Sequence, residues 1–180
     1  MAKEPVAGDR YYYAGGKKVE LAPADDLIAV DASALADRRV AKEIEATVRR
    51  NFKPLSGGVG LIHRADLGSE ANEVVKALEE AGVTHPVFRS YGAVVVVLPE
   101  VRVEEGRGGA KQKHLADWLA SHSKDALVKS RAEGRVVLEP TSGYGGDALA
   151  LANQLAEQVG PEMAQARFLR IVPRASTVRG

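Results

Sequence analysis

The C-terminal half of the chain alternates strand-like and helix-like patterns in an order that few folds can accommodate. A β-branched run at Arg135–Glu139 predicts a strand, and a glycine-rich turn separates it from an amphipathic pattern at Asp147–Val159. Apolar residues recur every four positions in that pattern, which predicts a helix with Asp147 as its N-cap. Gly160 is expected to end the helix, and Ala166–Ile171 predicts a closing strand.

Three segments upstream extend this order. Val101–Glu104 predicts a strand, Ala110–His122 a helix with Trp118 on its inner face, and Ala126–Val128 a weak strand. The complete order is β-α-β-β-α-β, which is the ferredoxin-like arrangement of an antiparallel sheet backed by two helices. We therefore expect a ferredoxin-like subdomain over residues 107–172, completed by the strand at 101–104.

Residues 11–106 predict a smaller α/β subdomain. The fold class expected for the whole chain is therefore α+β, with antiparallel sheets whose helices pack on one face. Residues 1–10 are expected to be a flexible arm, and residues 173–180 a tail. The predicted elements of the N-terminal half are a hairpin at Tyr11–Leu21, strands at Asp26–Asp31, Val59–His63, Pro86–Ser90 and Ala93–Leu98, and helices at Leu35–Phe52 and Ser69–Ala81.

Single residues set some of these boundaries. Ser69 is the expected N-cap of the second helix, and Gly82 is its expected C-cap. Pro99 has no backbone N–H, so it is expected to interrupt strand pairing before Val101. The glycine-rich segment Gly106–Gly109 is the best internal boundary between the two halves.

The charge balance and the lack of cysteine exclude several classes of function. The 180 residues include 25 basic and 24 acidic side chains, and only 5% are aromatic, which gives no general attraction for nucleic acid or anionic membrane. The absence of cysteine excludes disulfides and thiol catalysis. No apolar run is long enough to cross a membrane, and no signal-peptide pattern is present. We expect a cytoplasmic protein, or a secreted or periplasmic one if the chain belongs to a larger precursor.

No group of residues in the sequence predicts catalysis. The turn at Thr141–Gly146 lacks the Gly-Lys-Ser/Thr ending of a phosphate loop, and no serine lies in a Gly-x-Ser-x-Gly motif. The four histidines are scattered, so they do not predict a metal site. Adjacent acidic pairs such as Asp25-Asp26 point to opposite faces of a strand. We therefore expect no enzyme activity, no catalytic residue, no metal and no cofactor.

Several blocks of the chain share the pattern of one protein family. The first is Tyr11–Val30, which opens with Tyr-Tyr-Tyr-Ala-Gly-Gly, and the second is Val87–Glu104. Asp147–Leu155 and Ala164–Arg170 complete the set. These blocks resemble the N-terminal prodomain, or propeptide, of bacterial subtilisin-like (S8 family) serine proteases. The family often has Ala-x-Pro-x-Phe in its last strand, whereas the stretch ending at Phe168 lacks that proline.

The resemblance implies a partner protein that inhibits a subtilisin-like serine protease or assists its folding as a chaperone. The open face of the sheet would dock on the protease, and the C-terminal tail would lie in the cleft like a substrate. Glu157 and Glu162 would contact the N-termini of protease helices, where carboxylates are favoured. The protease-binding tail would consist of Phe168, Leu169, Arg170, Ile171, Val172, Pro173 and Arg174.

Two other functions are compatible with the sequence. One is a small α/β enzyme or ligand-binding domain that uses the loops at Thr141–Gly146 or Ser56–Gly60. The other is an adaptor in a bacterial protein assembly, in which the strand edge at Tyr11–Tyr13 pairs with another chain. The arginines Arg170, Arg174 and Arg179 also have the character of processing sites in a longer precursor. The sequence leaves the oligomeric state open, and no nucleic-acid or membrane partner is expected.

Overall fold

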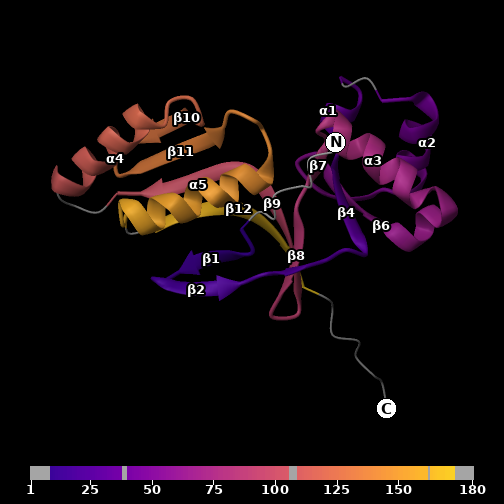
Figure 1. The fold of residues 1–180 in the computed structure, drawn as a ribbon, viewed down its shortest axis with the longest axis horizontal. Helices are drawn as coiled ribbons and strands as arrows, with labels where there is room; N and C mark the ends of the chain where they lie inside the picture. Colours follow the sequence, from indigo (N-terminus) through magenta and orange to yellow (C-terminus); the bar gives the residue numbers. More distant parts are fainter. Residues whose placement is uncertain (1–8, 38–39, 106–108, 162, 173–180) are drawn as a thin grey trace, which may run out of the picture.

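The computed structural model describes residues 9–37, 40–105, 109–161 and 163–172. Two larger antiparallel sheets each carry helices, and a two-stranded hairpin packs beside them (Figure 1). The chain therefore has the α+β fold class that the sequence predicts. Within the described ranges, every helix is too short or too polar to cross a membrane.

The C-terminal half folds as a ferredoxin-like unit. The spatial order of its strands is β10–β11–β9–β12, and every neighbouring pair is antiparallel. This order confirms the predicted β-α-β-β-α-β arrangement. Its elements along the chain are β9 (Ala93–Glu104), α4 (Gly109–Ser121), β10 (Ala126–Ala132), β11 (Arg135–Pro140), α5 (Gly145–Gln158) and β12 (Met163–Ile171).

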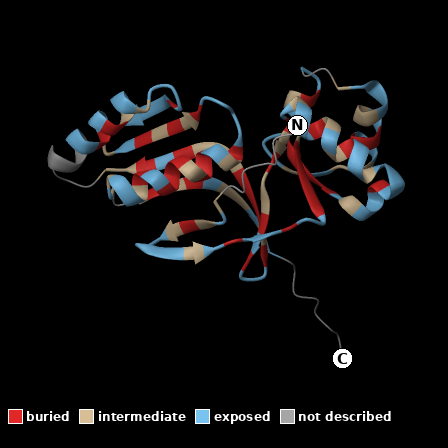
Figure 2. Cartoon of the chain, viewed as in Figure 1, coloured by how far each residue is buried: buried red, intermediate tan, exposed pale blue. Residues whose placement is uncertain are grey.

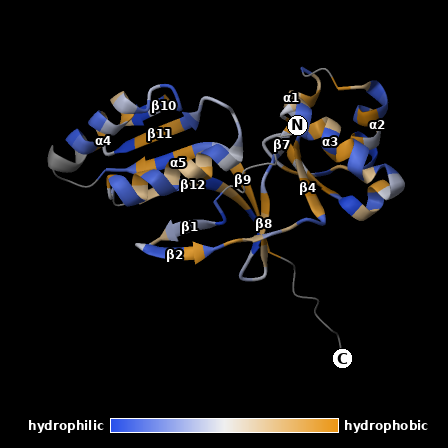
Figure 3. Ribbon diagram, viewed as in Figure 1, coloured by the Kyte–Doolittle hydropathy of each residue, from blue (hydrophilic) through white to orange (hydrophobic). Residues whose placement is uncertain are grey.

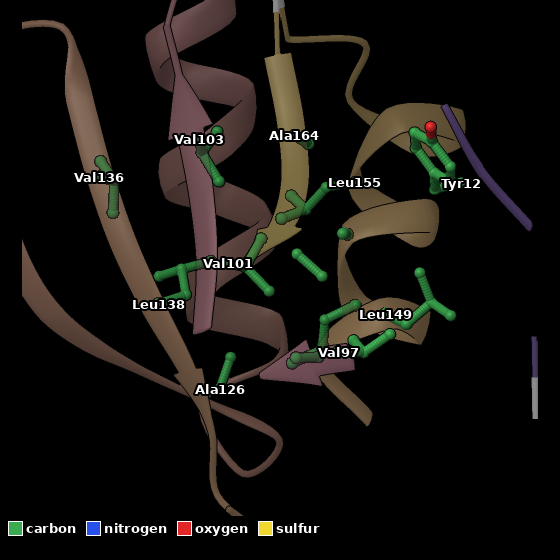
Figure 4. Close-up of a cluster of buried hydrophobic side chains, with 14 of the residues drawn as sticks. Tyr12, Val97, Val101, Val103, Ala126, Val136, Leu138, Leu149, Leu155 and Ala164 are labelled. Carbon is green, nitrogen blue, oxygen red and sulfur yellow. The ribbon is translucent and has the colours of Figure 1, made fainter. Parts of the chain in front are cut away.

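The face of this sheet beneath α4 and α5 is apolar. Along β9, Val101 and Val103 are buried, whereas the intervening Arg102 is exposed, as the period of two in a strand requires. Figure 2 marks buried positions along β9, β11 and α5, and Figure 4 shows the side chains of these elements gathered in one cluster. Trp118 of α4 is buried in the same cluster, and its indole Nε1 donates a hydrogen bond of 3.1 Å to Gln158 of α5. The two helices are thereby joined over one core.

The N-terminal half contains a second antiparallel sheet in the order β5–β6–β4–β7. Along β4, Ile28 and Val30 face the helices, while Ala29 lies in a different cluster on the opposite face. Burial on both faces accounts for the continuous apolar colour of β4 in Figure 3. The elements are β3 (Ala22–Pro23), β4 (Leu27–Asp31), α1 (Ala32–Leu35), α2 (Lys42–Asn51), β5 (Lys53–Ser56), β6 (Val59–His63), the 3-10 segment η1 (Arg64–Glu70), α3 (Ala71–Ala81) and β7 (Thr84–His85).

The prediction of one helix over Leu35–Phe52 is wrong, because α1 and α2 are separate. Asp31 caps α1 by accepting a hydrogen bond of 3.0 Å from the backbone N–H of Ser33. Leu35 of α1 and Val48 of α2 are both buried in the core beneath the second sheet. The apolar periodicity that predicted a single helix therefore reflects a shared core.

The predicted caps Gly82 and Gly160 agree with the structure, whereas Ser69 and Asp147 differ. Gly82 ends α3 in the left-handed conformation, with φ 69, as predicted. Ser69 does not cap α3, because it lies inside η1 after Gly68, whose positive φ of 59 kinks the chain. Asp147 is in the first turn of α5 instead of preceding it, because that helix already begins at Gly145. A carboxylate in a first turn still favours the helix dipole.

Strand β9 continues through Pro99, so the expected separation into two strands is wrong. Before Pro99 the strand pairs with β8 (Val87–Ser90), and after it with β11. On its other side, the register with β12 shifts between Ala166 and Phe168, opposite the proline. Pro99 thus lies where the hydrogen-bond ladder changes partners, and a missing N–H costs little there.

The hairpin formed by β1 (Tyr11–Ala14) and β2 (Lys17–Glu20) packs on the C-terminal half. Tyr12 is buried in the core beneath α5, with its ring centroid 5.0 Å from that of Phe168 in an edge-to-face arrangement. Asn153 of α5 is 2% exposed and donates hydrogen bonds to the carbonyl of Tyr11 at 2.8 Å and to the carboxylate of Asp9 at 3.0 Å. These contacts fix the start of the chain against its last helix.

Contacts between the halves cross the predicted boundary between 11–106 and 107–172. Ala29 of β4 and Leu61 of β6 form an apolar cluster against which Leu169 and Ile171 of β12 pack, so the two sheets pack together across this boundary. β9 also contributes to the core beneath α4 and α5. The division into subdomains therefore stays a prediction.

Candidate protein-binding surface

Strand β12 distributes the predicted tail residues over both of its faces. Phe168 packs against Tyr12, and the Nη2 of Arg170 donates a hydrogen bond of 3.3 Å to the hydroxyl of the same tyrosine. Leu169 and Ile171 pack in the apolar cluster between the two sheets. The fold thus holds these four residues in place through contacts on both sides of the strand.

The chain leaves the sheet immediately after these residues. Ile171 is the last paired residue of β12, and its partner is Val94 of β9. Val172 follows and is 68% exposed, whereas the preceding Ile171 is half-buried. The last side chain that the structure describes is therefore apolar and largely open to solvent. Pro173 and Arg174 lie outside the described residues.

Glu157 lies on α5 and holds the N-terminal hairpin. Its Oε1 accepts hydrogen bonds from the hydroxyls of Tyr11 at 3.1 Å and Tyr13 at 2.8 Å. Desolvation, together with the hydrogen bond to Glu157, raises the pKa of Tyr11 to about 12. The hydrogen bond to the same carboxylate raises the pKa of Tyr13. This carboxylate is therefore already engaged within the chain. Glu162, its predicted companion, lies outside the described residues.

The sheet face opposite α4 and α5 carries charged side chains. The register places Glu104 opposite Arg135, and their side chains form an ion pair of 3.4 Å. Exposed pairs of this kind contribute about 0–1 kcal/mol each, so they organise the face more than they stabilise the fold. The charged residues joined by ion pairs on this face are Glu100, Arg102, Glu104, Lys129, Arg135, Glu139 and Arg167.

Glu100 is the centre of this charged face. Its Oε1 lies 3.5 Å from Nε of Arg102. Its Oε2 lies 3.5 Å from Nζ of Lys129 and 3.6 Å from Nη1 of Arg167. The Glu100 side chain is only 14% exposed, whereas the three cations are about half exposed. Around the shielded Glu100 the face therefore presents positive charge outward, whereas Glu104 and Glu139 add partly exposed carboxylates elsewhere on it. No local sequence pattern predicts this cluster, because its members come from three strands.

The hairpin between β8 and β9 ends in an exposed tyrosine. Ser90 pairs with Ala93, which leaves Tyr91 and Gly92 as a two-residue turn with φ of 48 and 74. Two positive φ values define a type I′ turn, where asparagine or glycine is usual at the first position. Tyr91 is 89% exposed. The sequence predicted a turn here but gave no indication of this exposure.

A groove of about 330 Å³ between the two halves contains a buried histidine. His85 is 8% exposed, and burial lowers its pKa, so the imidazole is neutral near pH 7. Its Nδ1 has no hydrogen-bond partner among the described residues. Within that part of the chain, no three histidine or acidic side chains are grouped as metal ligands. The groove is therefore lined by one buried imidazole together with the ionisable side chains of Asp25, Arg64 and Glu79.

The glycine-rich loop before α5 is explained by packing. A Cβ on Gly145 would overlap the carbonyl oxygen of Val97 and would lie 2.8 Å from its carbonyl carbon. Thr141, at the other end of the loop, donates a hydrogen bond of 2.8 Å to the carbonyl of Lys124. The close approach of α5 to β9 therefore accounts for glycine at this position.

Comparisons of the chain with protein-family models, with curated proteins and with solved structures found no match. The functional argument therefore rests on the chain's own residues. The surface features that they supply are the end of β12, the charged sheet face and the exposed hairpin tip.

Proposed function

We propose that the protein binds a subtilisin-like serine protease and inhibits it, assists its folding, or does both. The observation that carries the proposal is the end of the ferredoxin-like sheet. Its last strand is fixed by core contacts up to Ile171, and the chain then leaves the sheet at an exposed Val172. This arrangement supports a rigid domain that presents a C-terminal tail to a partner, as the resemblance to protease prodomains implies.

In the proposed complex, the tail binds in the protease cleft as an added strand. Residues from Val172 onward supply backbone N–H and C=O groups to the cleft, while side chains fill the pockets along it. The docked domain raises the effective concentration of the tail, because the tail is tethered to it. Phe168 and Leu169 anchor the strand from which the tail extends.

The charged sheet face is the proposed docking surface of the domain. Arg102, Lys129 and Arg167 surround the shielded Glu100, so the partner surface opposite them is expected to be acidic. Opposite charges accelerate association and favour the correct partner, and both effects weaken as salt screens them. The association rate with the protease is therefore expected to fall as ionic strength rises.

The proposal is tested first by capturing partners with the full chain as bait. Both lysate and culture medium of the source organism are sampled, because the compartment stays a prediction. Bound proteins are identified by mass spectrometry, and captured proteases are assayed with and without added bait. Recovery of a subtilisin-like protease that the bait inhibits supports the proposal. If no such protease is bound or inhibited, the proposal is wrong.

A truncation then tests the role of the tail. Deleting residues 172–180 spares every paired residue of β12 and should raise the inhibition constant on the order of 100-fold or more. Deleting residues 1–8 is the matched control, because it removes a similar length and leaves Asp9 and its contact with Asn153 in place. Equal inhibition by both variants would show that the tail does not occupy the cleft.

A further inference from the structure

The β8–β9 hairpin tip combines backbone strain with exposure. Tyr91 has a φ of 48, a conformation that disfavours bulky L-residues and that asparagine or glycine adopts more readily. In the described part of the chain, its ring enters no aromatic pair and its hydroxyl no hydrogen bond, and the residue is 89% exposed. The fold therefore gains nothing visible from this side chain. Retained strain of this kind points to a functional contact.

The tip stands on a rigid base. Ser90 is 5% exposed and Ala93 is 3% exposed, and they close the turn as a pair. Pairing continues down the hairpin to Val87 and Val96. A tyrosine on such a base loses little conformational freedom when it binds, because only its two side-chain torsions remain to be fixed.

The tip lies beside the point where the chain leaves the sheet. Val94 pairs with Ile171, the last residue of β12, and it is three residues from Tyr91 along the hairpin. At about 3.3 Å per residue, the tip and the exposed Val172 are on the order of 10 Å apart along the sheet. Figure 1 shows the hairpin loop and the end of β12 at the same end of the molecule. One partner can therefore contact both.

The tip also carries no unpaired charge. Arg89 is the nearest charged residue on β8, and its guanidinium donates two hydrogen bonds, of 2.5 and 2.7 Å, to the carboxylate of Asp26. The turn itself consists of uncharged residues, which leaves a bare aromatic ring at its apex. Buried centres of protein interfaces are depleted in charge and enriched in tyrosine, and one such ring buries roughly 150–250 Å².

We propose that Tyr91 is a second anchor for the protease, and that its ring packs in an apolar depression on the protease surface next to the substrate cleft. This inference rests on the proposed function and adds a contact that the tail and the sheet face do not supply. The hairpin fixes the angle at which the tail enters the cleft. Binding of the ring and the tail together explains why a strained tyrosine is kept at an exposed turn.

The test uses opposite effects of one substitution on stability and on binding. Tyr91→Asn relieves the positive-φ strain, so the midpoint of thermal unfolding should stay the same or rise, while the inhibition constant rises about tenfold or more. Tyr91→Gly should behave in the same way. This second variant shows that the loss of inhibition comes from removing the ring and not from the added amide of asparagine. Tyr91→Phe keeps the ring and should inhibit like the parent chain.

Tyr144→Asn is the matched control. Tyr144 is also an exposed tyrosine, at 45%, but it lies at the start of α5. Its replacement should leave inhibition unchanged. If the parent inhibits and both the asparagine and glycine variants at position 91 inhibit equally well, the second anchor is refuted while the protease function stands. If the parent inhibits no subtilisin-like protease, the proposed function itself fails, and this inference fails with it.

Discussion

Replacing Gly145 by alanine should destabilise the protein strongly, although alanine is the better helix former. The added Cβ would overlap the carbonyl oxygen of Val97 and lie 2.8 Å from its carbonyl carbon and 3.2 Å from Cδ of Pro86. Carbon atoms pack best at about 3.5–4.0 Å, so the start of α5 would have to move by roughly 0.7 Å or more. Val97 is fully buried in a strand paired on both sides, so it cannot yield.

The magnitude follows from two opposing contributions. Overpacking of a rigid core costs about 1–3 kcal/mol or more, and the clash with backbone atoms places this site at the upper end. Alanine returns up to about 1 kcal/mol of helix propensity. The net loss is about 2–3 kcal/mol, which for a chain of this size lowers the unfolding midpoint by roughly 4–12 °C.

The assay is urea and thermal unfolding of Gly145→Ala beside Gly146→Ala. The neighbouring glycine is in the same helical turn, but a Cβ there meets only the side chain of Tyr144, which is 45% exposed and can rotate away. The control variant should therefore be as stable as the parent or slightly more stable. If the free energy of unfolding of Gly145→Ala is within about 0.5 kcal/mol of that of the parent, the close approach of α5 to β9 is not the reason that glycine is needed at this position.

Three further perturbations test the electrostatics. Glu100→Gln removes the carboxylate that three cations share, so the free energy of unfolding should fall by about 1 kcal/mol at low salt and by less at high salt, as measured by urea titration. The pKa of Tyr11 is raised to about 12, so the contribution of its hydroxyl to stability is present below pH 10 and is lost as pH rises through 12. Tyr11→Phe should therefore remove the highest step when phenolate absorbance is titrated against pH. The hydrogen bond from Arg89 lowers the pKa of Asp26 to about 2, so the contribution of this carboxylate to stability is present above pH 3.8 and is lost as pH falls toward 2. Asp26→Asn should therefore shift the acid unfolding curve of the chain to higher pH.

Much of the C-terminal fold could be predicted because its signals are local. Helix α5 shows its period within a few turns, and Gly160, which follows its C-cap Val159, has the positive φ of 65 expected just after a helix. The break between α1 and α2 was missed, because Leu35 and Val48 contribute to one core from different helices. Apolar spacing alone does not distinguish one long helix from two short ones with a common core.

The surface was less predictable, because its contacts join distant parts of the chain. Tyr13 and Glu157 are 144 residues apart, and no local pattern predicts their hydrogen bond. The charged face depends on strand register, which decides that Glu104 faces Arg135. A local signal did exist at the hairpin tip: Tyr91 precedes Gly92 where asparagine or glycine is usual.

β12 is expected both to close the sheet and to lead into the protease-binding tail. These two roles restrict where a substrate-like segment can begin. Phe168 and Ile171 are held by core contacts, and the backbone from one to the other pairs with Val97 through Val94. Withdrawing this stretch into a protease cleft would expose the cluster between the two sheets and break the ladder that holds the hairpin tip. A rigid domain therefore has to deliver its tail from Val172 onward. It follows that inhibition should respond to substitutions after Ile171, whereas substitutions within β12 should act first on stability.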